Sequence, residues 1–376
     1  MKPTSRLPLL AATLLASAGV LTSVALAPRS AAATPQPTDS IARIGTLQIP
    51  GEPLTSFDIG FVNADGVYAL ADRSNQGLDF FDSATGRFLG RATGFKGANA
   101  DHDLSGPNGV VAVGRDQFWA GDGDSTVKAV DLRTKKVIAN ISTGGKKRAD
   151  EVAYDSRDHL IIAVNNADDP PFVTFISTRT RKVVGRLVLK RASDGAEQPV
   201  WNPATGLVYI SIPTVDDVKA NGAVAVVDPR TYKLVKLLPV SKCMPAGLAL
   251  GPHDDLLLGC SKDAVEAGFS PRSFVMSAAS GKIVATLPKV GGSDEVWSDL
   301  KAGRYYLAAE ANTGGPALGV VNSRANRWIA NLPTGSHAHS VAADATTGKV
   351  FVPIAAGASG AGCTKGCVAV FGLPVE

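Results

Sequence analysis

The alternation of hydrophobic and polar positions divides the chain into short apolar strands that are separated by polar turns. Six segments share one pattern: an apolar strand, a turn that begins with Asp, Ser or Asn, a basic residue, and a second apolar strand. Side chains of Asp, Ser and Asn suit the first turn position because they hydrogen-bond to the turn's own backbone. The segments are FFDSATGRFLG at 80, AVDLRTKKVIA at 129, FISTRTRKVVG at 175, VVDPRTYKLVK at 226, VMSAASGKIVA at 275 and VVNSRANRWIA at 320.

A second type of hairpin alternates with the first and occurs seven times. Two hairpins in each repeat give four strands, and the period of roughly 45 to 50 residues is that of propeller blades. Connections rich in Gly and Pro, with no long amphipathic helix, indicate an all-β chain. The sequence therefore predicts a seven-bladed β-propeller of four-stranded blades. The seven hairpins are IGFVNADGVYALA at 59, NGVVAVGRDQFWAGD at 108, EVAYDSRDHLIIAVN at 151, VWNPATGLVYISIP at 200, GLALGPHDDLLLGCS at 247, VWSDLKAGRYYLAAE at 296 and SVAADATTGKVFVPI at 340.

The seventh blade lacks an outer strand at the C-terminal end of the chain, where GCVAVFGLPVE at 366 supplies only a third strand. A candidate for the missing strand lies near the other end, because IARIGTLQIPG at 41 is similar to the fourth strands of other blades. We expect this N-terminal strand to complete the last blade, since closing the ring covers strand edges that would otherwise be open.

The turns of the D-x-x-T-x-K type, together with inner hairpins such as NPATGLVYIS at 202, resemble the YVTN and YncE-like seven-bladed propellers of exported bacterial proteins. The resemblance covers essentially the whole chain after its first residues and implies blade architecture, not chemistry. The similarity to SMP-30/gluconolactonase propellers is weaker. Those proteins hold a divalent metal with Glu, Asn and Asp at the centre of one face and open lactones, and they usually have six blades.

The N-terminus has the features of a secretory signal. Lys2 and Arg6 precede an uncharged apolar stretch from 7 to 27, and Ala31 to Ala33 form a cleavage site of the A-x-A kind. We therefore expect residues 1–33 to be a signal peptide and residues 34–376 to form one domain; a retained membrane anchor is the alternative, because a run of this length can span a bilayer. After signal removal we expect no membrane span and a periplasmic or secreted protein.

The four cysteines of an exported chain favour disulfides. Cys243 and Cys260 flank one inner hairpin, and Cys363 and Cys367 bracket a three-residue loop, so the sequence predicts two local bridges. The net charge of +4, from 38 basic and 34 acidic residues, is too balanced to favour a nucleic acid as a partner.

Polar residues precede most of the inner strands. In a propeller these strands line the axis, so the residues that lead into them should meet at one mouth of the channel. Six blades bring polar residues: Asp58, Asn108, Asp150, Glu151, Glu197, Gln198, Asp294, Glu295, His337 and His339. The remaining blade brings Met244 and Pro245. We also expect Asp72 and Asp122, among other loop carboxylates, on the same face, and expect that face to receive a small-molecule or protein partner. His102, in a loop between blades, either reaches the mouth or is solvated.

A ring of oxygen ligands is what Ca²⁺ or Mg²⁺ prefers. The sequence thus predicts a divalent-cation site made of Asn108, Asp150, Glu151, Asp294 and Glu295. Clustered carboxylates also raise one another's pKa, so Glu151, Glu295 and His339 are the candidates for acid or base catalysis. The alternative is a solvated channel mouth with a purely structural role.

Two functions follow from these patterns. The first is a binding or scaffold protein whose acidic mouth holds a cation and a small ligand. The second is a metal-dependent hydrolase or lyase that acts on a lactone-like molecule, as the SMP-30 similarity implies. No G-x-S-x-G motif for a serine hydrolase is present in the sequence.

Overall fold

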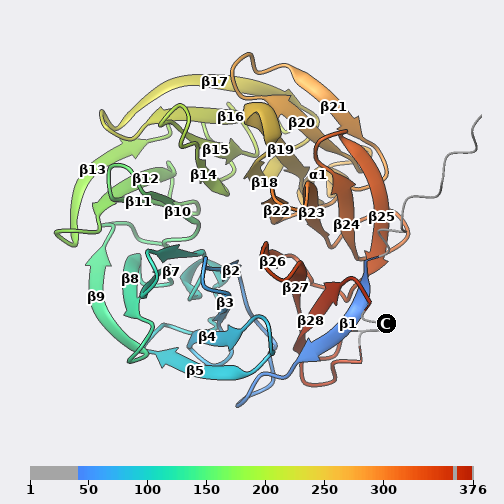
Figure 1. Ribbon diagram of the computed structural model, residues 1–376. Coiled ribbons are helices and arrows are strands. Elements are labelled where there is room, and N and C mark those ends of the chain that lie inside the picture. The colour runs from blue at the N-terminus through green and yellow to red at the C-terminus, as the bar shows by residue number, and fades with distance from the viewer. Residues whose placement is uncertain (1–40, 359–361, 375–376) are drawn as a thin grey trace, which may run out of the picture. The chain divides into compact units, whose positions relative to one another are not determined.

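The computed structural model describes residues 41–358 and 362–374. These residues form seven antiparallel sheets of four strands each, arranged as a ring around a central axis (Figure 1). The prediction of a seven-bladed β-propeller is confirmed. The expected signal peptide, residues 1–33, lies outside the described residues.

Each of the first six blades is built from four consecutive strands, the first at the axis and the fourth at the rim (Figure 1). Blades 1 to 3 consist of β2 (Gly60–Val62), β3 (Val67–Asp72), β4 (Gly77–Asp82) and β5 (Phe88–Thr93); β6 (Val110–Val113), β7 (Gln117–Asp122), β8 (Thr126–Asp131) and β9 (Lys136–Ser142); and β10 (Val152–Asp155), β11 (Leu160–Asn165), β12 (Phe172–Ser177) and β13 (Lys182–Val188). Blades 4 to 6 consist of β14 (Pro199–Trp201), β15 (Val208–Ile212), β16 (Asn221–Asp228) and β17 (Lys233–Ser241); β18 (Pro245–Leu250), β19 (Asp255–Cys260), β20 (Ser273–Ser277) and β21 (Ile283–Leu287); and β22 (Val296–Asp299), β23 (Arg304–Ala309), β24 (Ala317–Asn322) and β25 (Arg327–Pro333).

The seventh blade joins the two ends of the ring. It contains β26 (Ala342–Asp344), β27 (Lys349–Ile354) and β28 (Cys367–Gly372), and β1 (Ala42–Leu47) pairs antiparallel with β28 as its outer strand. The predicted closure by the N-terminal strand is therefore confirmed, and β28 has a hydrogen-bonded neighbour on each side.

The Asp and Thr of the repeated outer turns explain why the D-x-x-T pattern recurs. In blade 1, Asp82 accepts hydrogen bonds from the backbone N–H of Thr85 at 2.8 Å and from its hydroxyl at 2.9 Å. In blade 2, Asp131 makes the same two contacts with Thr134 at 2.7 Å. These hydrogen bonds lower the pKa of both carboxyls and hold the turn that joins the third strand to the fourth.

Every outer strand carries a β-bulge one or two residues after it begins, and an apolar side chain occupies the extra position. A bulge at an edge strand disrupts the regular ladder and so discourages pairing with another chain. The bulged residues are Ile44, Leu89, Ile138, Val184, Val235, Val284 and Ile329. Four of these side chains, those of Ile44, Val184, Val235 and Val284, are exposed, and because the bulge recurs in all seven blades we attribute their exposure to the architecture of the rim.

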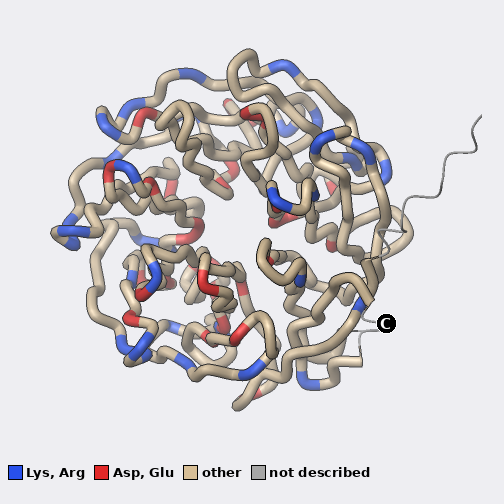
Figure 2. Tube along the Cα trace, in the orientation of Figure 1, with Lys and Arg blue, Asp and Glu red and all other residues tan. Residues whose placement is uncertain are grey.

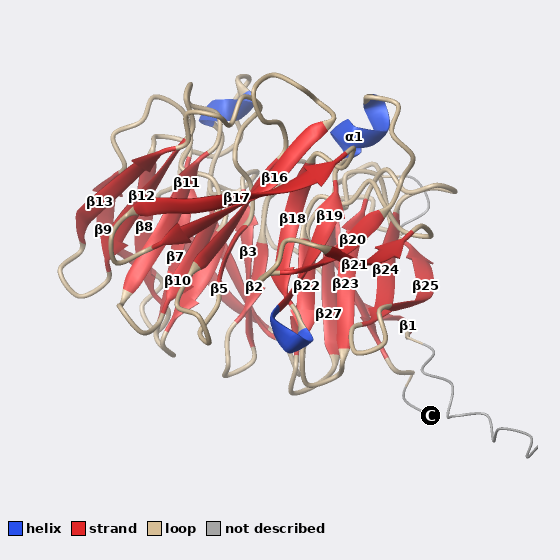
Figure 3. Cartoon of the chain, turned by 90° about the horizontal axis from the view of Figure 1, so that it is seen from above, coloured by secondary structure: helices blue, strands red, loops and turns tan. Residues whose placement is uncertain are grey.

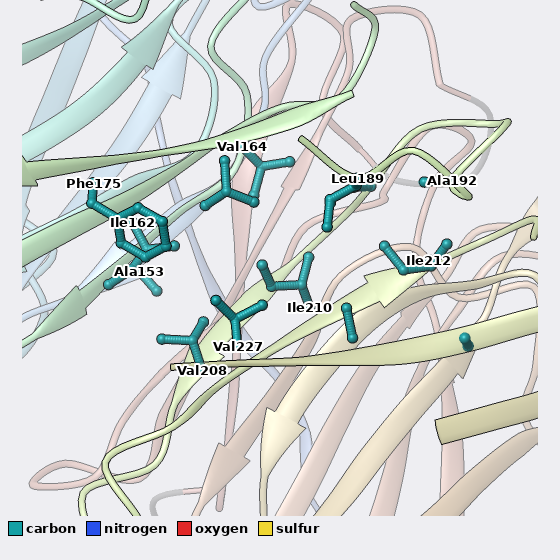
Figure 4. Packing of buried hydrophobic residues seen from close by; sticks show 14 of the residues in the cluster. Ala153, Ile162, Val164, Phe175, Leu189, Ala192, Val208, Ile210, Ile212 and Val227 are labelled. Carbon is teal, nitrogen blue, oxygen red and sulfur yellow. The ribbon is translucent and has the colours of Figure 1, made fainter. Parts of the chain in front are cut away.

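The core lies between adjacent blades, which present apolar faces to each other. Between blades 3 and 4, for example, Ile162 and Phe175 pack in one cluster with Ile210 and Val227 (Figure 4). All four side chains are fully buried. Such contacts fix the angle between blades and therefore the positions of the strands at the axis.

In the part of the chain that the structure describes, helical structure is confined to short segments, among them α1 (Lys262–Glu266), which lies in the loop after β19 at one end of the strands (Figure 3). The 3-10 turn at His102–Leu104 lies between blades 1 and 2. Within the described ranges no helix is long and apolar enough to cross a membrane.

Both predicted disulfides are confirmed. Cys243 is bonded to Cys260, which links the chain just before β18 to the end of β19, and Cys363 is bonded to Cys367 at the start of β28. Such bonds are typical of proteins that function in oxidising compartments.

Candidate functional site

The residues that lead into the inner strands line one cavity at the centre of the ring, which we call the acidic cavity. Its volume is about 370 Å³. Acidic positions gather around the central opening, whereas many basic ones lie at the rim (Figure 2). Seven carboxyl groups line the cavity against three Arg or Lys side chains. These charged side chains are Asp58, Asp150, Glu151, Glu197, Asp294, Glu295 and Glu310, with Arg73, Arg148 and Lys262.

Arg73 binds two of the predicted mouth residues. Its guanidinium donates to the Asn108 side-chain oxygen at 2.6 and 3.1 Å and forms a salt bridge with the buried carboxylate of Asp58. Asn108 in turn donates to the carbonyl of Ala149 at 2.8 Å, which ties blade 2 to blade 3. Asn108 is fully buried and does not line the cavity, so its role in this structure is to hold the wall.

Arg148 binds a third mouth residue. It forms an ion pair with Asp150 at 3.0 Å and lies 2.7 Å from the Nδ1 atom of His102. The other ring nitrogen of His102 lies 3.0 Å from Arg73. Burial lowers the pKa of His102, and the two neighbouring guanidinium groups lower it further. His102 therefore reaches the acidic cavity and bridges the two arginines.

His339 has the contacts of an imidazolium ion. Its Nδ1 atom lies 2.9 Å from the carbonyl oxygen of His337, and its Nε2 atom lies 3.4 Å from the carboxylate of Asp58. Both neighbours are acceptors, so both ring nitrogens carry protons. Burial alone would lower the pKa of His339, but Asp58 and Asp294 raise it to about 9. The ring also stacks on Phe57, with centroids 4.8 Å apart.

Glu151 and Glu295 form no ion pair within residues 41–358 and 362–374, although the charge of His339 acts on Glu295 from a distance. Their exposed fractions are 6% and 2%. They hydrogen-bond to each other, and the described part of the chain supplies no other donor to either carboxyl. Burial raises the pKa of Glu295 to about 8, and burial together with the charge of Glu295 raises that of Glu151 well above its usual range. The pair is therefore able to share a proton.

Asp294 and Glu197 complete the acidic wall. Burial raises the pKa of Asp294 to about 7, against the lowering effect of His339. Burial also raises the pKa of Glu197, and the charges of Asp150 and Asp294 raise it further. The closest donor to Glu197 is the Asn166 amide at 3.5 Å. Both carboxyls are thus available to a ligand.

Three other predicted mouth residues do not line the acidic cavity. Gln198 accepts from the backbone N–H of Leu248 at 2.6 Å and donates to the carbonyl of Val296 at 3.4 Å, so its amide joins blades 4, 5 and 6. Met244 and Pro245 are buried beside the Cys243–Cys260 bond. The loop carboxyls Asp72 and Asp122 do not form an exposed acidic surface because both are fully buried against partners within their blades.

Four of the five predicted metal ligands line the acidic cavity, and Asn108 does not. Asn108 and Asp150 are held by Arg73 and Arg148, which leaves Glu151, Asp294 and Glu295. Among residues 41–358 and 362–374 there is no group of three or more His, Cys, Asp or Glu side chains arranged to hold a metal ion. As positioned here, the set does not fit a divalent cation, and we derive no chemical step through one.

A second cavity adjoins the acidic cavity along the axis, and we call it the apolar chamber. Its volume is about 290 Å³. Glu151 and Glu295 line both spaces, and the remaining wall is mostly apolar and aromatic, with Phe61, Trp201 and Trp297. The Phe61 and Trp297 rings meet edge to face, with centroids 5.2 Å apart. The carboxyl pair therefore marks the boundary between a charged and an apolar compartment.

Sequence reasoning missed the two arginines that decide which carboxyls are free. Arg148 stands two residues before Asp150, and Arg73 follows the buried strand β3, positions that would ordinarily be assigned to solvated loops. A basic residue next to a predicted buried acid was the available signal, since a buried charge requires a partner.

The class of protein that these features define is a seven-bladed β-propeller with an acidic axial cavity. The chain is similar to a solved structure entitled Kuenenia stuttgartiensis hydrazine synthase, with a TM-score of 0.68 and 13% sequence identity over 88% of this chain and 98% of that chain. At this identity the likeness shows the fold. No protein-family model matches the sequence. No curated protein matches it either.

Proposed function

We propose that this protein is an exported binding protein whose acidic cavity binds a small positively charged ligand. One observation carries the proposal: Glu151 and Glu295 are buried side by side and form no ion pair within the described residues. Bringing two carboxylates out of water without compensation is unfavourable. A bound cation would supply the missing charge and stabilise the folded protein by binding to it preferentially.

The proposal is tested by titrating purified protein with Ca²⁺, Mg²⁺ and methylammonium while its melting temperature and heat of binding are recorded. We expect saturable binding of at least one of these cations, and loss of that binding in the double variant Glu151→Gln, Glu295→Gln, which keeps the shape and removes the charge. The matched control is Glu266→Gln, an exposed carboxyl that lines neither cavity. If none of the cations binds, the proposal is wrong.

The second candidate is a hydrolase or lyase of lactone-like molecules, with Glu151, Glu295 and His339 as acid or base. It is supported by the pKa values of Asp294, about 7, and Glu295, about 8, because groups that titrate near neutral pH can donate and accept protons during a reaction. The test is turnover of a panel of lactones with and without Mg²⁺ or Ca²⁺. Turnover that Glu295→Gln abolishes would support it, and no turnover under either condition would reject it.

A further inference from the structure

We infer that the ligand is an amphipathic organic ammonium ion, with its charged nitrogen between Glu151 and Glu295 and its apolar body in the apolar chamber. The inference rests on the proposed function, since it names the class of cation that the site binds. Three features of the described residues support it: the shared position of the carboxyl pair, the composition of the chamber and the poor fit to a metal ion.

The carboxyl pair belongs to both compartments. Glu151 precedes β10 and Glu295 precedes β22, in blades 3 and 6, so the two side chains approach the axis from different parts of the ring. Both line the acidic cavity and the apolar chamber. A ligand bound by the pair from the chamber side would have a charged end at the boundary and an uncharged remainder below it.

The chamber offers surfaces that favour the uncharged part of such a ligand. Phe61, Trp201 and Trp297 contribute aromatic rings, and Leu248 and Val110 contribute aliphatic side chains. Aromatic faces also attract an ammonium group or the methylenes next to it. The volume of about 290 Å³ accommodates roughly ten water-sized groups at about 30 Å³ each. That is the size of a short alkyl or phenylalkyl amine.

An ammonium ion satisfies the pair better than a metal ion would. An alkylammonium carries three N–H donors, so it can donate to both carboxyls at once. Calcium requires six to eight oxygen ligands, and the apolar chamber supplies few. The Gln198 amide, which also borders the chamber, is already bound to the backbone of blades 5 and 6.

Calorimetric titration with hexylamine, methylamine and hexan-1-ol at pH 7 tests the inference on the unaltered protein. Each buried methylene contributes about fourfold in affinity, so hexylamine should bind at least a hundredfold more tightly than methylamine. Hexan-1-ol has the same apolar body without the charge and should bind at least tenfold more weakly than hexylamine. Equal affinities of the two amines, or of hexylamine and the alcohol, would overturn the inference.

Two variants separate the charged end from the apolar end. Glu295→Gln should lower the affinity for both amines at least tenfold. Trp297→Ala should lower the affinity for hexylamine at least tenfold and leave that for methylamine unchanged. Trp328→Ala is the matched control, because Trp328 lies on the outer strand β25 away from the channel. Circular dichroism and melting curves establish that each variant is folded.

The outcomes distinguish this inference from the proposed function. If methylamine, Ca²⁺ or Mg²⁺ binds at the carboxyl pair and hexylamine binds no more tightly than methylamine, the proposed cation site is supported and the amphipathic ligand is rejected. If no amine and no metal ion binds, both are rejected.

Discussion

The carboxyl of Glu151, which precedes the first strand of blade 3, hydrogen-bonds to the carboxyl of Glu295, which precedes the first strand of blade 6. This contact joins two blades that are not neighbours in the ring. Two acids can share a hydrogen bond only when one of them is protonated, so the contact favours proton binding by the pair in the folded protein. Its effects on stability and on ligand binding can be measured separately.

Glu295→Gln should stabilise the ligand-free protein at pH 8. The raised pKa of Glu295 means that its ionised form is disfavoured in the folded state. Glutamine remains neutral and can still hydrogen-bond to Glu151, so we expect the free energy of unfolding to rise by roughly 1–3 kcal/mol, at about 1.4 kcal/mol per pKa unit. Thermal or urea unfolding at pH 8 measures the change, with Glu266→Gln as the control. A lower stability than wild type at pH 8 would contradict the role given to the pair.

The stability of the ligand-free protein should fall as the pH rises from about 5 to about 9. Burial raises the pKa of Asp294 to about 7 and that of Glu295 to about 8. Burial would lower the pKa of His339, but Asp58 raises it to about 9. In all three cases the folded state holds a proton that the unfolded state has released. Each group's contribution to folding stability is therefore complete below its unfolded pKa and is lost as the pH rises through its folded pKa. The charged groups around them are Asp58, Arg73, Arg148, Asp150, Glu151 and Glu310.

At low pH the dependence is reversed, and the stability of the folded protein falls as the pH falls. Burial alone would raise the pKa of Asp58, but Arg73 and His339 lower it to about 2. The contribution of Asp58 to folding stability is present above its unfolded pKa of 3.8 and is lost as the pH falls towards 2. Melting temperatures measured from pH 3 to pH 10 test both limbs. A profile that rises steadily from pH 5 to pH 9 is incompatible with these pKa shifts.

Arg148→Gln should increase cation binding while it lowers stability. Arg148 is the ion-pair partner of Asp150 and contacts His102, and its removal leaves the Asp150 carboxylate without its cation in a cavity that is already acidic. Breaking a buried pair in this way costs about 3–5 kcal/mol. The added negative charge should strengthen the binding of methylammonium or Ca²⁺ severalfold by calorimetry. Weaker binding in a folded variant would show that Arg148 itself contributes to the ligand site.

The architecture could be predicted from the sequence because it repeats. Asp82 and Asp131 occupy equivalent turns and bind the following Thr in the same way, so a local rule applied to each repeat yields the whole ring. Closure by β1 was predictable for the same reason, since the strand from 41 resembles the other fourth strands. The β-bulge in every outer strand could not be predicted, because the alternation of apolar and polar residues does not indicate where an extra residue is inserted.

The site could be predicted only in part because its electrostatics depend on contacts between blades. The pattern placed Glu151, Asp294, Glu295 and His339 at the axis, where the structure has them. It gave no indication that Arg73 reaches Asn108 from the neighbouring blade, or that the Gln198 amide is bound to backbone atoms. These distinctions depend on three-dimensional packing that no single repeat encodes.

The Cys243–Cys260 bond should stabilise blade 5, whose residues leading into β18 are apolar where the other blades have polar residues. The bond closes a loop with a sequence separation of 17, for which the gain is about 3 kcal/mol in chain-entropy terms. The double variant Cys243→Ser, Cys260→Ser should therefore melt at a lower temperature. The same pair of changes at Cys363 and Cys367, whose separation is 4, should cost less, because shorter loops constrain the unfolded chain less. The reverse order would show that local packing dominates over chain entropy.

Deletion of residues 41–48 should destabilise the ring and promote association. The deletion removes β1, exposes the edge of β28 and leaves blade 7 with three strands. Leu47 packs in a core cluster with Phe351 and Val370, so buried apolar contacts are lost together with the backbone hydrogen bonds. We expect a lower melting temperature and concentration-dependent oligomers by size-exclusion chromatography, since an open strand edge pairs with other chains. The matched control is Ile44→Lys, which alters the exposed bulge and keeps the strand. A truncated protein that remains monomeric with an unchanged melting temperature would show that blade 7 is stable without its outer strand.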